Sequence, residues 1–311
     1  MLADLKLGPA YDGFLFLAED SRHPPSLRSH HHAELELNLV ARGEITYVVR
    51  GQRLKFPART LLWLFPSQEH QLVDRTSDSQ YYVAVFKPSL IASACHDPAY
   101  DGLKSRSGSG RPVLQSLLAP DAFDFLKNLM ARVMEGSLDP DLLNREGGFG
   151  AESDFRYQHM DPDGLNAGLR HLMLLAWRMH QSGQARHGGI ALHPSILKAL
   201  ETLGDDSWEG DLGDLARTCG VSESHFSRLF ARQMGIPLNR YRNSLRLARF
   251  WEQLQLPAKP TLLEAALASG FGSYAQFYKV FFAAYGEGPR TCLRGELFPS
   301  PADRIPDKES A

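Results

Sequence analysis

The histidines in the stretch RSHHHAELE, residues 28–36, have types and spacing that could do chemistry. His30, His32 and Glu36 are separated by even numbers of residues, so on a β-strand all three side chains would point to one face. Imidazole and carboxylate groups are ligands for divalent transition metals, and they are also good hydrogen-bonding partners for a polar molecule. Which of these uses applies depends on the elements that position the cluster.

Residues 11–90, which carry this cluster, have the pattern of a β-rich domain. Alternating or β-branched runs occur at 34–41, 45–49, 61–65 and 81–86, and Arg42-Gly43 and Arg50-Gly51 provide turns. Several short strands at close spacing predict a sandwich or a barrel. We place this domain at residues 1–110.

The pattern becomes helical after about residue 112. Residues 120–135 and 162–182 carry apolar side chains at helical spacing, and the Gly- and Asp-rich stretch between them predicts a loop. We expect a helical region at 111–182 and a linker at 183–192, which contains three glycines. The tail at 299–311 has proline and charge but few apolar residues, so we expect it to be disordered.

Residues 211–232 predict a helix-turn-helix unit. Gly220 supplies the turn, and Ser222 can cap the second helix with its hydroxyl. The second helix would bury Phe226 and Phe230. Its outward face would carry Glu223, Ser224, Ser227 and Arg228. In this motif the second helix enters the major groove of DNA.

Residues 261–282 repeat the design, with Gly270 at the turn and Ser273 at the cap. Phe277 and Phe281 match the first pair of phenylalanines, and the outward residues would be Tyr274, Gln276, Tyr278 and Lys279. Residues 237–254 predict a connecting helix about 27 Å long, against about 34 Å for one turn of DNA. Its arginines include Arg240 and Arg242, which we expect to contact phosphates.

Local charge supports a nucleic-acid role for this region. Eleven basic and five acidic side chains give residues 212–294 a net charge of +6, whereas the whole chain carries −2. Such a patch is what a phosphate-binding surface requires. The alternative is a helical bundle with a solvated charged face. Two units with matching phenylalanines, joined by an arginine-bearing helix, argue against it.

The segment 212–294 resembles the DNA-binding domain of AraC/XylS-family transcription regulators. The resemblance is carried by LARTCGVSESHFSRLFARQMGIP and by ASGFGSYAQFYKVFFAAYGEGPRTCLR, which includes Gly288-Pro289-Arg290. It implies a DNA-binding domain at 193–298, with base contacts from Ser224, Ser227 and Arg228 in the first recognition helix. Contacts from the second would come from Tyr274, Gln276, Tyr278 and Lys279. Tyr274 and Tyr278 stand where family members often have small polar residues.

The N-terminal histidines resemble the first motif of cupin barrels, His30-x-His32-x₃-Glu36-x₆-Gly43, and His70 stands where the second motif has a histidine. AraC-type regulators often carry such a barrel as their effector-binding domain. The resemblance therefore implies that His30, His32, Glu36 and His70 line the barrel interior and bind an effector.

A metal at the same four residues is a second interpretation, because metal-binding cupins hold iron, manganese or zinc there. Arg59 and Ser67, however, stand where the enzymes favour glycine. This departure favours hydrogen bonds to an organic effector over a metal. His31, between two inward-pointing neighbours, would face solvent.

The expected fold class is α+β and multidomain: a cupin-like β-barrel with a helical hairpin, then an all-α domain with two helix-turn-helix units. The expected function is a sequence-specific transcription regulator modulated by a small molecule in the barrel, a sugar being one candidate. One alternative is a metal-dependent cupin enzyme fused to a DNA-binding module. Another is a constitutive DNA-binding protein whose barrel only dimerises.

The expected partners are double-stranded operator DNA, the effector, RNA polymerase and a second copy of the chain, held through helices 120–135 and 162–182. No catalytic residue is assigned and no cofactor is required, the candidate metal apart. Three distant cysteines without a CxxC motif indicate a reducing compartment, which is the cytoplasm. The chain lacks an apolar run of 18 residues and a signal-peptide pattern, so we expect no membrane association.

Overall fold

The structure is a computed structural model of the chain. It describes residues 5, 7–18, 29–104, 113–137, 158–185, 189–205, 208, 210–255 and 260–297. The predicted tail at 299–311 and most of the predicted loop at 136–161 lie outside these ranges. Two compact units are present, Met1–Ala248 and Arg249–Ala311. No helix in the described ranges is long and apolar enough to cross a membrane.

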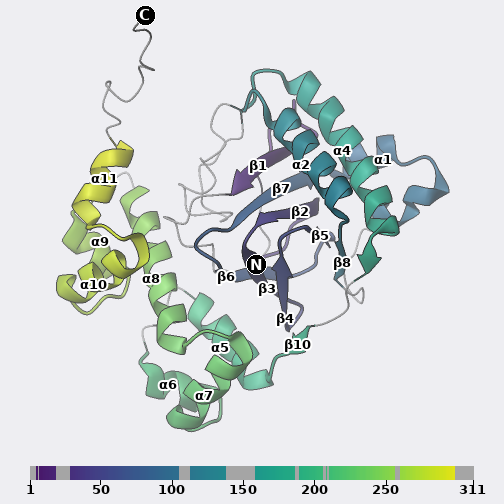
Figure 1. The fold of residues 1–311 in the computed structure, drawn as a ribbon. Coiled ribbons are helices and arrows are strands. Elements are labelled where there is room, and N and C mark those ends of the chain that lie inside the picture. The colour runs from purple at the N-terminus through teal and green to yellow at the C-terminus, as the bar shows by residue number, and fades with distance from the viewer. Residues whose placement is uncertain are drawn as a thin grey trace, which may run out of the picture. The chain divides into compact units, whose positions relative to one another are not determined.

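Two antiparallel β-sheets form the barrel of the first unit (Figure 1). One sheet has the order β1-β7-β2-β5-β8-β9, with strands at Gly13–Ala18, Gln80–Phe86, Leu35–Arg42, Thr60–Leu64, Leu114–Leu117 and Gln184–Ala185. The other has the order β10-β4-β3-β6, with strands at Ile190–Ala191, Gln52–Pro57, Glu44–Val49 and His70–Arg75. A single bridge between His30 and His70 extends the pairing beyond these strands.

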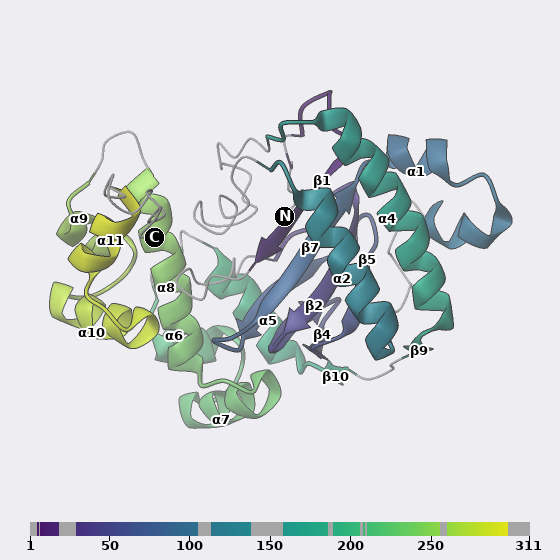
Figure 2. The same ribbon diagram turned by 45° about the horizontal axis from the view of Figure 1, so that its top comes forward.

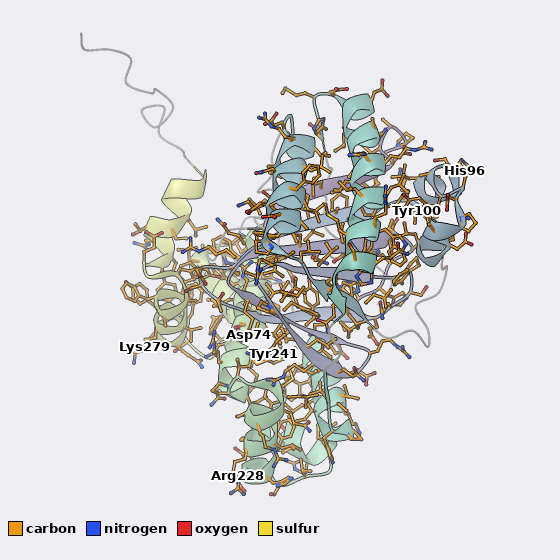
Figure 3. The ribbon with its side chains drawn as sticks, turned by 45° about the vertical axis from the view of Figure 1, so that its right-hand side comes forward. Asp74, His96, Tyr100, Arg228, Tyr241 and Lys279 are labelled. Atoms are coloured by element: carbon orange, nitrogen blue, oxygen red, sulfur yellow. The ribbon has the colours of Figure 1, made fainter. Side chains whose placement is uncertain are left out.

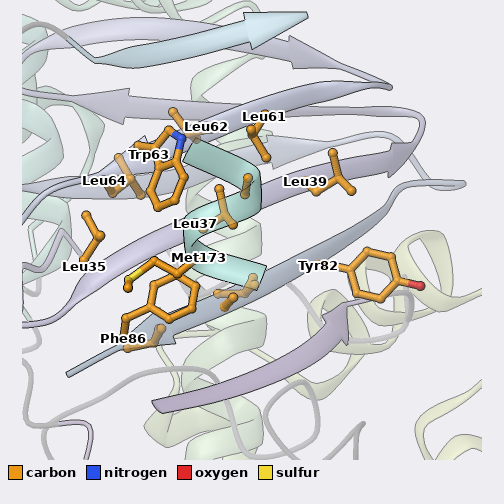
Figure 4. Close-up of a cluster of buried hydrophobic side chains, with 14 of the residues drawn as sticks. Leu35, Leu37, Leu39, Leu61, Leu62, Trp63, Leu64, Tyr82, Phe86 and Met173 are labelled. Atoms are coloured by element: carbon orange, nitrogen blue, oxygen red, sulfur yellow. The ribbon is translucent and has the colours of Figure 1, made fainter. Parts of the chain in front are cut away.

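Side chains of β2 alternate between two faces of its sheet. Leu35, Leu37 and Leu39 are fully buried in an apolar cluster that includes Trp63 and Met173 (Figure 4). The helices α2 (Pro120–Met134) and α4 (Pro162–Ser182) lie along the sheet (Figure 2), and α4 supplies Trp177, whose ring stands edge-on to Trp63 with centroids 5.6 Å apart. Glu36 and Asn38 point the other way, into the barrel.

The predicted helices at 120–135 and 162–182 are confirmed as α2 and α4. Between β7 and β8 lie α1 (Pro88–Ala94) and a 3-10 helix (Pro98–Lys104). The first unit continues with α5 (Pro194–Gly204), α6 (Leu212–Thr218) and α7 (Glu223–Met234). The helix α8 (Leu238–Gln255) confirms the predicted connecting helix and enters the second unit, which contains α9 (Leu262–Ala268), α10 (Tyr274–Tyr285) and α11 (Pro289–Leu297).

Three short strands lie where the sequence predicted none. β8 falls within the predicted helical region 111–182, and β9 and β10 fall within the predicted linker 183–192. These strands are two to four residues long, too short to show the alternation by which strands are recognised. The barrel therefore extends beyond residue 110, and β9 and β10 tie the linker segment to one sheet each.

Candidate functional site

The first helix-turn-helix unit is formed by α6 and α7. Asp211 caps α6 in a reciprocal capping box with Asp214, and Gly220 takes a positive φ of 72° at the turn. Phe226 and Phe230 are fully buried, as predicted. Ser222 occupies the N-cap position of α7, but its side chain makes no capping hydrogen bond. The predicted position of the cap is therefore confirmed, whereas the predicted side-chain hydrogen bond is wrong.

The outward face of α7 presents the residues expected to read bases. Ser224 and Arg228 are exposed, whereas Ser227 is half-buried. The Nε of Arg228 donates to the Ser224 carbonyl at 3.2 Å, which holds the stem of the side chain against the helix. Figure 3 shows Arg228 at the surface of its unit.

The second helix-turn-helix unit, α9 and α10, has the same construction. Thr261 and Glu264 form the capping box of α9, and Gly270 turns the chain with a φ of 86°. The Ser273 hydroxyl accepts from the backbone N–H of Gln276 at 3.2 Å, so this predicted cap is confirmed. The buried rings are Phe277 and Phe281, which pack on Phe250 with centroids 4.4 and 5.9 Å away.

The outward side chains of α10 include both polar and aromatic residues, whereas those of α7 are polar. Gln276 and Lys279 are exposed, and Gln276 accepts from the Gly272 N–H at 3.0 Å (Lys279 is labelled in Figure 3). Tyr274 is only half-buried, and Tyr278 is 43% exposed with its ring stacked on Phe282. Two aromatic rings therefore flank the polar positions of this helix.

The two arginines of α8 that were expected to contact phosphates have different surroundings. Arg240 is exposed and its guanidinium donates to Asp74 of β6 at 3.4 Å. Arg242 is half-buried over the Trp208 ring, 5.5 Å from its centroid, and donates to the Gly210 carbonyl at 3.3 Å. Burial lowers the pKa of Arg242. Arg242 is thus held by contacts with Trp208 and Gly210, while the side chain of Arg240 is exposed to solvent.

Within the barrel, the four residues of the cupin-like motif come together. His30, His32, Glu36 and His70 are each at most 6% exposed. The rings of His30 and His70 have centroids 4.3 Å apart, and those of His32 and His70 are 5.3 Å apart. Backbone hydrogen bonds in both directions between His30 and His70, of 3.0 and 2.9 Å, hold the two motifs against each other. His31, which was expected to face solvent, is half-buried and thus only partly more exposed than His30 and His32.

Glu36 is the centre of this cluster. Its Oε2 lies 3.0 Å from Nε2 of His32 and 3.7 Å from Nε2 of His70, and its Oε1 accepts from the Asn38 amide at 2.7 Å. Burial alone would raise the pKa of Glu36, but the His32 hydrogen bond and the neighbouring imidazoles lower it to about 2. Burial lowers the pKa of His70. Burial is also the largest single effect on the pKa of His32, but the hydrogen bond to Glu36 and the charges of Glu36 and Glu34 together raise that pKa.

Several polar atoms beside the cluster are buried without a hydrogen-bond partner. In the described residues these include Asn38 Oδ1, Gln68 Nε2 and His70 Nε2. Asn38 offers an acceptor and Gln68 a donor, each fixed by a bond through its other amide atom, to Glu36 and from the Phe65 N–H respectively. Unpaired buried polar groups cost free energy, so each of these atoms can accept a further polar partner.

Comparison with protein families matches two separate segments of the chain. Residues 16–143 match the AraC-like ligand binding domain, and residues 215–295 match a helix-turn-helix domain. The chain belongs to the AraC family of transcription regulators. This AraC-family protein accordingly combines a DNA-binding helix-turn-helix segment with a ligand-binding domain, as the sequence predicted.

Solved structures with similarity to this AraC-family chain include ToxT from Vibrio cholerae. It is 11% identical with a TM-score of 0.33, over 90% of this chain and 97% of ToxT. The AraC-like transcriptional activator CuxR is also 11% identical, with a TM-score of 0.29, over 83% of this chain and 78% of CuxR.

Sequence reasoning missed four residues that the structure connects to the candidate sites. Asn38 belongs to the cluster and could have been found by extending the even spacing two residues past Glu36. Gln71 of β6 donates to the Tyr241 hydroxyl of α8 at 2.9 Å, and Asp74 pairs with Arg240. These last contacts join segments about 170 residues apart, and no local pattern signals them.

Proposed function

We propose that this AraC-family regulator binds operator DNA through α7 and α10 and changes its DNA binding when a small polar molecule enters the barrel. The carrying observation is the buried, incompletely hydrogen-bonded cluster inside a domain that matches a ligand-binding family. The chain would act in the cytoplasm, together with RNA polymerase, and without a catalytic step of its own.

DNA contact would be divided between bases and phosphates. Arg228 can make the bidentate bond to guanine that is the commonest specific contact in the major groove, with Ser224 and Ser227 beside it. From α10, Gln276 and Lys279 can reach base edges, and Tyr274 and Tyr278 offer apolar contact. Arg240, exposed on α8, suits a phosphate. Arg242 would need to leave Trp208 to do the same.

The chemistry of the cluster indicates the class of effector. The unpaired atoms include one amide acceptor, one amide donor and one imidazole nitrogen. A hydroxyl group both donates and accepts, so a hydroxylated molecule such as a sugar could satisfy them together. The Tyr47 ring lies beside the cluster, with its centroid 6.3 Å from that of His70, so a ligand bound there would also gain from burial of its carbon atoms.

Strand β6 offers a direct route from the effector to the DNA-binding helices. His70 and Leu72 point into the barrel, whereas Gln71 points out and bonds to the Tyr241 hydroxyl. Val48 and Val73 belong to the same buried cluster as Tyr241 and the helices α5 to α7. A ligand that displaces His70 would move Gln71 with it, because the two are adjacent in one strand.

The Asp74–Arg240 pair is the second contact of this route (Asp74 and Tyr241 are labelled in Figure 3). When Asp74 holds Arg240, the guanidinium shares its charge with a carboxylate and is less available to DNA. We infer that the barrel in this state weakens phosphate contact, and that effector binding alters the pair through β6.

A homodimer is part of the proposal. The outer surface of α2 exposes Phe125, which is 54% accessible, and a large exposed apolar side chain on a helix is a candidate contact with a second copy. Light scattering of the purified chain tests this, with Phe125→Asp expected to shift a dimer to a monomer. An unchanged mass would place the interface elsewhere.

DNA recognition is tested by selecting bound sequences from random duplexes with the purified full chain. Arg228→Ala should weaken binding to the selected duplex by about 1–3 kcal/mol and relax preference at one position. Arg132→Ala on α2 is the matched control, since it removes an exposed arginine away from the helix-turn-helix units. Failure to select any sequence, or equal losses in both variants, would contradict the assignment.

A further inference from the structure

The two helix-turn-helix units place different side chains at matching outward positions. Counted from the two buried phenylalanines of each unit, the residues of α7 and α10 correspond in three pairs: Ser224 with Ala275, Ser227 with Tyr278, and Arg228 with Lys279. The serine to which we assign a base contact is thus replaced in the second unit by an alanine, which is exposed in the first turn of α10. Sequence reasoning had not placed Ala275 among the DNA contacts.

The second unit also carries less positive charge around its recognition helix. In the first unit, Arg217 precedes the turn glycine by three residues and Arg232 lies near the end of α7, and both are exposed. The matching positions of the second unit hold Leu267 and Ala283, which are exposed as well. A surface without these two arginines attracts phosphates less strongly. Its share of the binding free energy has to come from other contacts.

The ring of Tyr278 is held in one position on this surface. It stacks on Phe282, with centroids 6.2 Å apart and an interplanar angle of 17°. Its hydroxyl lies over Gly288, where a Cβ would stand only 3.1 Å from the oxygen. Ala275 lies three residues before Tyr278, so the two side chains are neighbours on the helix surface. An exposed methyl group and a held aromatic ring therefore form an apolar strip along α10.

Thymine presents the matching apolar group. Its C5-methyl projects into the major groove, where alanine and aromatic side chains contact it. The polar neighbour Gln276 agrees with this match. Its amide oxygen accepts from the Gly272 N–H at 3.0 Å, so its amide nitrogen is the group that it offers to DNA. A donor suits thymine, whose O4 is an acceptor in the same groove.

We propose that α10 reads thymine: Ala275 and the ring of Tyr278 pack against C5-methyl groups, and Phe282 is a positioning residue that holds the ring. The first unit would read its bases through hydrogen bonds instead. This inference rests on the proposed function, because it names the base that the second unit recognises. Exposed rings can also dock a protein, but the strip continues into Gln276 and Lys279 on the outward face of a recognition helix, which favours DNA.

The test removes methyl groups from the DNA. A duplex selected by the purified full chain is synthesised with each thymine replaced singly by 2′-deoxyuridine, which lacks only the C5-methyl, and its affinity is measured by fluorescence anisotropy. We expect a loss of about four-fold at one or more thymines, as burial of one methyl group predicts. Affinity for the thymine duplex tests the proposed function, whereas the ratio of affinities for the thymine and uracil duplexes tests this inference.

Tyr278→Ser should abolish the loss, so that the thymine and uracil duplexes bind this variant equally. Ser227→Ala is the matched control, because it changes the corresponding position of the first unit and should keep the loss at the same thymines. Phe282→Ala should shrink the ratio of affinities, and Phe282→Tyr should restore it, because a tyrosine ring can take the same stacked position. Ala275→Ser is a second, independent variant, and it should reduce the loss at a neighbouring thymine.

Two results would overturn the inference while DNA binding itself stands. One is equal binding of the thymine and uracil duplexes by the wild type, which would leave the exposed rings for a protein partner. The other is a methyl dependence that neither Tyr278→Ser nor Ala275→Ser changes, which would place the thymine contact on other residues. A chain that selects no duplex at all would instead remove the proposed function, and this inference with it.

Discussion

Strands β2 and β6 both have one face toward the barrel interior, but their outward faces are used differently. The outward leucines of β2 belong to the same buried apolar cluster as residues of α4. The outward face of β6 carries Gln71 and Val73, which contact the cluster around α8. Apolar packing is not directional, whereas a buried hydrogen bond depends on one geometry and costs free energy when its two partners separate. The β2 side of the barrel thus contributes apolar packing, and the β6 side contributes a geometry-dependent contact that we propose carries the signal.

Truncation of Leu37 should give the largest loss of stability, because this side chain of β2 is fully buried in the apolar cluster that includes residues of α4. Leu37→Ala is expected to reduce the free energy of unfolding of the first unit by about 2–5 kcal/mol. Urea denaturation followed by tryptophan fluorescence measures this, since Trp63 and Trp177 lie in the same layer. Asn128→Ala, at an exposed position of α2, is the control and should cost far less. Similar losses in both would remove the distinction between the two faces.

Tyr241→Phe should reduce the free energy of unfolding less, by about 1–3 kcal/mol, because it removes the buried hydroxyl that accepts from the Gln71 amide. Replacement of both partners, Tyr241→Phe with Gln71→Met, should recover most of this loss, since neither half of this hydrogen bond is then buried without the other. Wild type, Tyr241→Phe, Gln71→Met and the double variant form a double-mutant cycle, with the free energy of unfolding of each measured by urea denaturation. Strict additivity of the two single losses would show that the hydrogen bond does not couple β6 to α8.

Ser67→Gly should have the smallest effect on the free energy of unfolding, and it should raise rather than lower it. Ser67 is exposed with a φ of 61°, which costs an L-residue about 1 kcal/mol that glycine avoids. We expect a gain of up to about 1 kcal/mol in the same denaturation experiment. Ser77→Gly, in an exposed turn where φ is not positive, should be neutral or slightly destabilising. A loss in Ser67→Gly would mean that the hydroxyl, not the backbone, matters there.

The sequence predicted the elements whose patterns are local and long. The two helix-turn-helix units, the connecting helix and four of the strands follow from periodicity and from turn residues. The even spacing of His30, His32 and Glu36 correctly placed them on one face. The short strands β8 to β10 could not be predicted, because two to four residues carry no period. The Gln71–Tyr241 and Asp74–Arg240 pairs depend on how a strand and a helix distant in the chain meet.

The inference that DNA affinity is set through β6 is tested most directly with Asp74→Asn. Fluorescence anisotropy of the selected duplex, titrated at several salt concentrations, compares wild type, Asp74→Asn, Arg240→Ala and the double variant. Release of Arg240 should tighten binding several-fold in Asp74→Asn and steepen the salt dependence by about one ion. The gain should vanish in the double variant. Unchanged affinity in Asp74→Asn, or a gain that persists without Arg240, would contradict the proposed route.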